Sequence, residues 1–301
     1  MRLALVALSL WLAAESPEEQ ARRGWELCRT RQFAAAAEAF AAAIRADPAL
    51  ATAHLGLGVA SSELGRADVS IAAFQEAVRL RPDHAESRYD LGLAYEKAGR
   101  LDDANRELQR AAALKPGYAA AELARAAVLV KQGQNHDAAE AYGRAAASEP
   151  GRPEAWLGLA ATFGNLERWP EAVDAFQKAL ALRPGDAEAT YRLGRAYEKM
   201  RRPADAARAY RRAIELDPAH AGAHYGLGLA CVDLGSTAEA IAAFRTVLRL
   251  QPDRAPARFN LALALLAAGD AAGAREEQRR LQELDPNLAG QLALRLPPAS
   301  P

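Results

Sequence analysis

Residues 213–230 read AIELDPAHAGAHYGLGLA. An apolar run with helical spacing stops at Asp217-Pro218, and a second run begins within a few residues, around Tyr225. Because proline has no N–H to donate and its ring clashes with the preceding turn, Pro218 marks the end of the first run as a helix. The stretch therefore predicts two helices joined by a short link.

Pro218 belongs to a series of prolines with a fixed spacing of 34 residues. The members of the series are Pro48, Pro82, Pro116, Pro150, Pro184, Pro218, Pro252 and Pro286. A fixed period of this length predicts a repeat architecture, in which each repeat is one supersecondary unit that buries its apolar face against its neighbours. With this proline at position 32, repeats 1 to 8 span 17–50, 51–84, 85–118, 119–152, 153–186, 187–220, 221–254 and 255–288.

Three columns of the aligned repeats keep a constant size. Position 8 is glycine or alanine in every repeat, position 20 is alanine or serine, and position 24 is bulky in the first seven repeats. Small residues let two helix axes approach, and a bulky side chain four positions later fills the space beside them. The columns predict a helix pair in each repeat, over about positions 1–14 and 17–30. Glycine often marks the turn between the two helices, at Gly65, Gly99, Gly133, Gly235 and Gly269.

Taken together, the columns resemble the tetratricopeptide repeat family. Repeat 6 matches the family at seven positions, with Leu193, Gly194, Tyr197, Ala206, Tyr210, Ala213 and Pro218. The resemblance covers 272 of 301 residues, which is eight repeats of 34. It implies an all-α fold, a right-handed superhelical solenoid of helix hairpins. Arg125 departs from the family pattern, which has leucine at position 7, so repeat 4 is the predicted weak point of the array.

Charge and motif content argue against two classes of protein. The 38 basic residues balance 38 acidic ones, so the chain lacks the basic surplus typical of nucleic-acid-binding proteins. The sequence has no phosphate-binding loop, no Gly-x-Ser-x-Gly motif and no His-Glu-x-x-His motif. The repeats also leave no separate catalytic domain. We therefore expect a protein that is not an enzyme and uses no cofactor.

His220, His224 and Cys231 form the best candidate for a metal site. The two histidines are four residues apart and the cysteine follows seven later, a spacing that places the three side chains on one helix face. Nitrogen and sulfur are zinc ligands, but three candidates without a fourth are a weak zinc signature. Positions 4 and 11 are also core-facing columns. We therefore expect packing and turn roles for these residues and no bound metal.

The two ends of the chain lie outside the repeats. Residues 1–16 contain Arg2 and then a twelve-residue apolar run, Leu3–Ala14, which has the length of a signal-peptide core and is too short to span a bilayer. The run predicts export to the periplasm or cell envelope of a bacterium. The alternative is an apolar helix that caps repeat 1 of a cytoplasmic protein. Residues 289–301 are expected to hold most of a closing helix, over 287–296, and a disordered tail.

The same resemblance implies that positions 2, 5, 9, 12 and 13 line the concave surface of the solenoid. Positions 5 and 9 are largely apolar and aromatic in this chain. Exposed apolar patches on soluble proteins mark partner sites. The predicted site consists of Tyr89, Leu93, Leu123, Leu157, Tyr191, Arg195, Tyr225, Leu229 and Phe259. The alternative is that a narrow superhelix buries these side chains against the next repeat.

Such a site predicts binding of a protein or peptide segment, either an amphipathic helix or an extended apolar peptide. Some relatives hold acidic peptide ends with lysine and asparagine at positions 5 and 9, where this chain has mainly Tyr, Leu, Phe and Ala. We therefore expect a non-catalytic scaffold or adaptor in bacterial envelope assembly, with no nucleic-acid partner and no membrane span. A self-assembling structural solenoid and a cytosolic adaptor are the alternatives.

Overall fold

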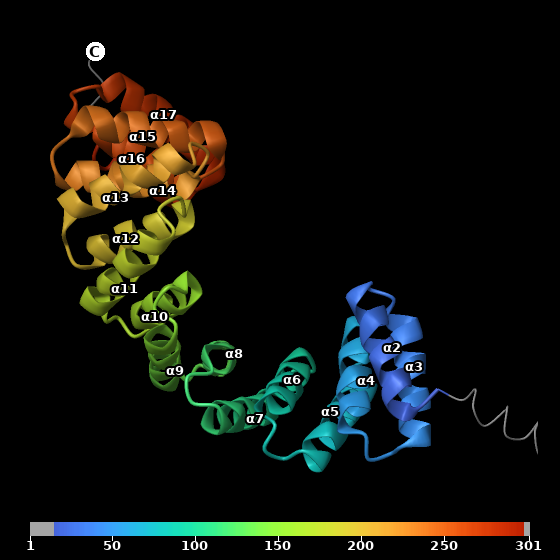
Figure 1. The fold of residues 1–301 in the computed structure, drawn as a ribbon. Helices are drawn as coiled ribbons and strands as arrows, with labels where there is room; N and C mark the ends of the chain where they lie inside the picture. Colours follow the sequence, from blue (N-terminus) through green and yellow to red (C-terminus); the bar gives the residue numbers. More distant parts are fainter. Residues whose placement is uncertain (1–14, 298–301) are drawn as a thin grey trace, which may run out of the picture. The chain divides into compact units, whose positions relative to one another are not determined.

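The protein is built from helices in two compact units. The computed structural model describes residues 15–297, and these residues form seventeen helices and no strand (Figure 1). Unit 1 ends at Pro150 and unit 2 begins at Gly151, close to the boundary between repeats 4 and 5. The all-α fold class predicted from the sequence is confirmed. The apolar run of the predicted signal segment and the last residues of the predicted tail lie outside the described residues.

Each repeat contributes one pair of helices. In unit 1 the pairs are α2 (Pro17–Arg29) and α3 (Phe33–Ala46), α4 (Ala51–Glu63) and α5 (Ala67–Leu80), α6 (Ala85–Lys97) and α7 (Leu101–Leu114), and α8 (Ala119–Lys131) and α9 (Asn135–Ser148). In unit 2 they are α10 (Pro153–Asn165) and α11 (Trp169–Leu182), α12 (Ala187–Lys199) and α13 (Pro203–Leu216), α14 (Ala221–Asp233) and α15 (Thr237–Leu250), and α16 (Ala255–Ala267) and α17 (Ala271–Leu284), followed by α18 (Pro286–Ala293). Within each unit every helix packs on the next one along the chain. The first helix of a pair spans positions 1–13 and the second spans positions 17–30, close to the predicted bounds.

The turn inside each hairpin requires a left-handed residue at position 15. The five predicted turn glycines all have positive φ, between 71° and 84°. The other three repeats place non-glycine residues there, and Arg31, Glu167 and Arg201 have φ of 60°, 57° and 54°. A side chain in this conformation brings Cβ close to the following carbonyl oxygen, at a cost of roughly 1–2 kcal/mol. Repeats 1, 5 and 6 therefore fold with strained turns.

In repeat 6 the core contains a ring that packs on glycine backbone. The Tyr210 ring of position 24 is fully buried. A Cβ at Gly194, position 8 of the same repeat, would lie 2.7 Å from this ring, and one at Gly226, position 6 of the next repeat, would lie 2.5 Å away. The Tyr210 hydroxyl donates a hydrogen bond to Glu198 at 2.6 Å, so the ring is also fixed at its far edge. The small residue at position 8 thus sets how closely the two helices of a hairpin pack, and the small residue at position 6 sets how closely the next hairpin packs.

A side chain at position 4 of a repeat contacts the link that precedes that repeat. His224 Nε2 lies 3.1 Å from the carbonyl oxygen of Pro218, the position-32 proline that precedes it. Arg258 donates to the carbonyl of Pro252 at 2.8 Å and forms a buried ion pair with Glu277 at 2.5 Å. The proline that ends one helix therefore offers its carbonyl to the next helix, which holds the short link in place.

Two features near the ends of the arrays complete the fold. Arg125 replaces the expected leucine in repeat 4 and donates from Nε to Asn105 Oδ1 at 3.0 Å, so a polar contact stands where apolar packing was expected.

The predicted closing helix is α18, which begins at Pro286, one residue earlier than expected, and is capped by Asp285. No helix among residues 15–297 is long and apolar enough to cross a membrane.

We predict that Gly226→Ala lowers the free energy of unfolding by about 1–3 kcal/mol, because the new methyl group would overlap the fixed Tyr210 ring. Gly143 in α9 is the matched control, since a Cβ there would meet nothing within 4 Å. Gly143→Ala should raise stability by about 0.5–1 kcal/mol through the lower backbone entropy of alanine. Urea unfolding followed by circular dichroism measures both changes. Equal effects of the two substitutions would contradict the role given to the ring.

We predict that Arg201→Gly raises the free energy of unfolding by about 1 kcal/mol, because glycine relieves the strain at a φ of 54°. The reciprocal change, Gly235→Ala at the same position of repeat 7, should lower stability by a similar amount. Thermal unfolding of the two variants beside the parent protein tests the pair. A destabilised Arg201→Gly variant would contradict the prediction, because it would show that contacts of the arginine side chain stabilise the fold by more than the backbone strain destabilises it.

Candidate functional site

The predicted site residues occupy one face of the first helices, at positions 5 and 9, and most are half-buried. Arg195 is exposed, and the other eight are intermediate in exposure. The Tyr191 ring lies 5.9 Å from the Tyr210 ring and 4.6 Å from the His220 ring, centroid to centroid. Tyr225 packs against Phe244 at 5.9 Å in the same way. These side chains are therefore partly packed against neighbouring residues and partly exposed. This state is intermediate between the two alternatives, an open groove and side chains buried against the next repeat. Their role in binding stays a prediction.

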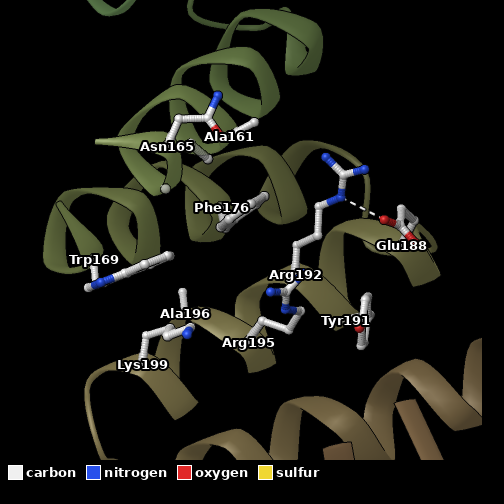
Figure 2. A pocket seen from close by; sticks show the side chains of 12 residues that line it. Ala161, Asn165, Trp169, Phe176, Glu188, Tyr191, Arg192, Arg195, Ala196 and Lys199 are labelled. Carbon is white, nitrogen blue, oxygen red and sulfur yellow. Dashed lines mark hydrogen bonds and ion pairs between the residues drawn. The ribbon is translucent and has the colours of Figure 1, made fainter. Parts of the chain in front are cut away.

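A hollow in unit 2 brings two of the predicted residues together with others. It has a volume of about 340 Å³ and lies among α10, α11 and α12 (Figure 2). Its lining consists of Ala160, Ala161, Gly164, Asn165, Trp169, Phe176, Glu188, Tyr191, Arg192, Arg195, Ala196 and Lys199. Tyr191 and Arg195 were predicted site residues, whereas Tyr225, Leu229 and Phe259 belong to later repeats and do not line it. We call this site the unit 2 hollow.

The residue at position 6 accounts for the hollow. Where glycine holds that position, as at Gly56 and Gly226, the ring of the preceding repeat lies directly against the helix backbone. In repeat 6, position 6 is Arg192, and the preceding ring, Phe176, instead lines the hollow. The opposite wall is shallow because α10 presents Ala161 and Gly164 at positions 9 and 12.

The unit 2 hollow carries excess positive charge. Arg192 Nε donates to Glu188 Oε1 at 2.6 Å (Figure 2). Burial disfavours the charged form of Glu188, but the hydrogen bonds and charges of Arg192 and His220 outweigh it and lower the pKa of this carboxyl. Arg195 and Lys199 form no ion pair and no hydrogen bond with the residues that the structure describes. The hollow therefore combines an apolar wall with two uncompensated cations.

The three candidate metal ligands serve other purposes. His220 Nδ1 accepts the backbone N–H of Ala223 at 3.1 Å and caps α14, which leaves the ring proton of the neutral form on Nε2, 3.3 Å from Glu188. His224 faces a proline carbonyl, as described above. Cys231 is buried, and burial raises the pKa of its thiol to about 11. Within residues 15–297 no three His, Cys, Asp or Glu side chains form a group that could hold a metal ion.

Unit 1 contains an equivalent hollow with the opposite charge. It has a volume of about 300 Å³ and is lined by Val59, Ser62, Glu63, Phe74, Asp90, Leu93, Ala94, Glu96 and Lys97. Position 6 is again charged, here by Asp90, and again the ring of the preceding repeat, Phe74, lines the space. Burial, and then the charge of Glu86, raise the pKa of Asp90 to about 6. The sequence pattern gave no indication of position 6, because only positions 2, 5, 9, 12 and 13 were expected on this face.

We predict that Asp90 makes the protein less stable as pH rises from about 4 to about 6. The folded-state pKa of Asp90 is raised from 3.8, so its stability contribution is complete below the unfolded pKa and is lost as pH rises through the folded pKa. A rise of this size corresponds to about 3 kcal/mol as an upper value. Asp90→Asn should therefore stabilise the protein at pH 7 and have little effect at pH 3.5. Urea unfolding at the two pH values measures this, and an equal effect at both would contradict the raised pKa.

Comparison with known families matches the part of the chain that holds the repeats. A sequence model described as tetratricopeptide repeat matches residues 22–68, 62–119, 123–187, 191–255 and 232–289, and a second model of that description matches 166–209. These matches cover most of the chain. The chain belongs to the tetratricopeptide repeat family. No curated protein matches it.

Solved tetratricopeptide structures share the fold. YrrB, described as a TPR protein with an unusual peptide-binding site, is 23% identical, with a TM-score of 0.57 over 62% of this chain and 97% of YrrB. The C-terminal part of a TPR protein from Cytophaga hutchinsonii is 17% identical, with a TM-score of 0.66 over 78% of this chain and 97% of that one. PilF from Pseudomonas aeruginosa is 19% identical, with a TM-score of 0.56 over 71% and 99%. At these identities the likeness establishes the tetratricopeptide fold alone.

Proposed function

We propose that this protein is a non-catalytic adaptor that binds a segment of a partner protein on the face of its first helices. The observation that carries the proposal is the unit 2 hollow, in which Tyr191 and Arg195 stand beside an apolar wall. Tyrosine and arginine are the residue types most enriched among binding anchors. Membership of a repeat family whose members bind proteins supports the same conclusion, as does the peptide-binding site named for YrrB.

The partner segment is an amphipathic helix or an extended peptide with apolar side chains. A hollow of about 340 Å³ has room for one or two side chains of a partner. The half-exposed leucines and aromatics at positions 5 and 9 of neighbouring repeats extend the apolar contact along each unit. Affinity would therefore come from several modest contacts and one anchor.

The proposed setting is assembly in a bacterial cell envelope. It rests on the apolar run at residues 3–14, which follows Arg2 and has the length of a signal-peptide core. A cytosolic adaptor is the alternative, in which the same run remains on the mature chain.

A photo-crosslinking experiment in the cells that make this protein tests the proposed binding face. We expect benzoylphenylalanine at Leu157 or Leu229 to give adducts with one protein partner, because both positions lie on the proposed binding face. The matched controls are Leu114 and Leu182, which are exposed at 43% and 44% and end second helices. Adducts that form equally at the control positions would contradict the proposed face.

The mass of the purified mature protein tests the setting. Loss of the N-terminal segment, together with recovery from the envelope fraction, is the expected result. An intact N-terminus in the cytosolic fraction would select the cytosolic alternative and leave the binding face unaffected.

A further inference from the structure

We infer that the unit 2 hollow selects an extended partner segment in which acidic side chains alternate with apolar ones. The inference rests on the proposed adaptor function and names the chemistry of its partner. It follows from the charge, the spacing and the shape of the hollow, each of which is set by side chains of repeats 5 and 6.

The charge is available to a ligand. Arg192 is already paired with Glu188, whereas Arg195 and Lys199 make no ion pair or hydrogen bond with the described residues. Both point into a space bordered by Ala161 and Trp169 (Figure 2). A carboxylate placed between them would form charge-assisted hydrogen bonds beside an apolar wall, where the lower local dielectric strengthens them.

The spacing of the two cations matches acidic side chains at alternate positions of an extended segment. Arg195 and Lys199 are four residues apart on α12, which is about 6 Å along the helix axis. An extended peptide repeats its side-chain direction every second residue, about 6.6–6.8 Å. Two acidic side chains at alternate positions therefore match the spacing of the two cations, one carboxylate to each.

The shape of the hollow accounts for the apolar side chains expected between the acidic ones. Side chains between the acidic ones point the other way, toward α10, where Ala161 and Gly164 leave the space open. The Phe176 and Trp169 rings border the same space. In contrast, the equivalent hollow of unit 1 has Leu93 in place of Arg195 and Lys97 in place of Lys199, and Asp90 and Glu63 make it acidic. Arg195 is thus the cation that distinguishes the unit 2 hollow, whereas a lysine at position 13 is common to both hollows.

Selection from a random dodecapeptide library displayed on phage tests the inference. We expect the unmodified protein to enrich peptides in which Asp or Glu alternates with Leu, Ile, Val or an aromatic residue. The Arg195→Glu, Lys199→Glu double variant should lose this enrichment. Arg245→Glu with Arg249→Glu is the matched control. Within residues 15–297 these two arginines also make no ion pair or hydrogen bond. They lie four residues apart on α15, and Arg249 is in its last turn, as Lys199 is in the last turn of α12.

A second variant acts by shape and leaves the charge unchanged. Ala161→Leu should fill the hollow and weaken binding of the best selected peptide by about ten-fold or more, measured with a synthetic copy that is acetylated and amidated. Trp169 lines the hollow, so its fluorescence should change on binding, and Trp169→Phe should remove that change. Circular dichroism and thermal unfolding confirm that each variant is folded.

The possible outcomes separate the inference from the proposed function. Peptides selected without acidic residues, or acidic peptides that still bind the Arg195, Lys199 double variant, would overturn the inference and leave the adaptor function standing. Loss of acidic selection in the Arg245, Arg249 control would also overturn it. A protein that selects no peptide at all would overturn both.

Discussion

The contact between a bulky side chain at position 24 and the small residues around it determines how the helices of this structure pack. It sets the separation of the two helices in a hairpin through position 8, and the separation of adjacent hairpins through position 6. Where position 6 is glycine, as at Gly226, the neighbouring helix closes onto the ring. Where it is Arg192 or Asp90, the ring borders a hollow instead. This column therefore distinguishes the tight contacts at Gly56 and Gly226 from the two hollows at Asp90 and Arg192.

Much of the fold could be predicted from the sequence because its determinants repeat at a fixed interval. The proline series located the links, the small residues at positions 8 and 20 located the helix crossings, and the glycines at position 15 located the turns. Each of these signals concerns a residue and its near neighbours in the chain, so a single sequence is enough to read it. The helix bounds, with second helices over positions 17–30, follow from the same signals.

The candidate site was only partly predictable because it depends on the distance between repeats. Tyr191 and Arg195 were identified from the columns that face away from the core. The sequence did not show that Tyr191 packs against Tyr210 and His220, since those contacts join α12 to α13 and to the link that follows α13. It also did not reveal the role of position 6, whose effect appears only when the ring of the preceding repeat is in place. The carbonyl contacts made from position 4, such as that of Arg258, were missed for the same reason.

The strained turns at Glu167 and Arg201 belong to the two repeats that form the unit 2 hollow. In an array where each hairpin is stabilised mainly by its neighbours, strain in one turn is not averaged over the whole molecule. Local opening should therefore require less free energy in repeats 5 and 6 than in repeats 7 and 8, whose turns carry glycine. A ligand that spans α10 and α12 would bridge the two strained hairpins and oppose that opening. A ligand bound in the hollow would then slow amide hydrogen exchange across both repeats, including residues that do not contact the ligand.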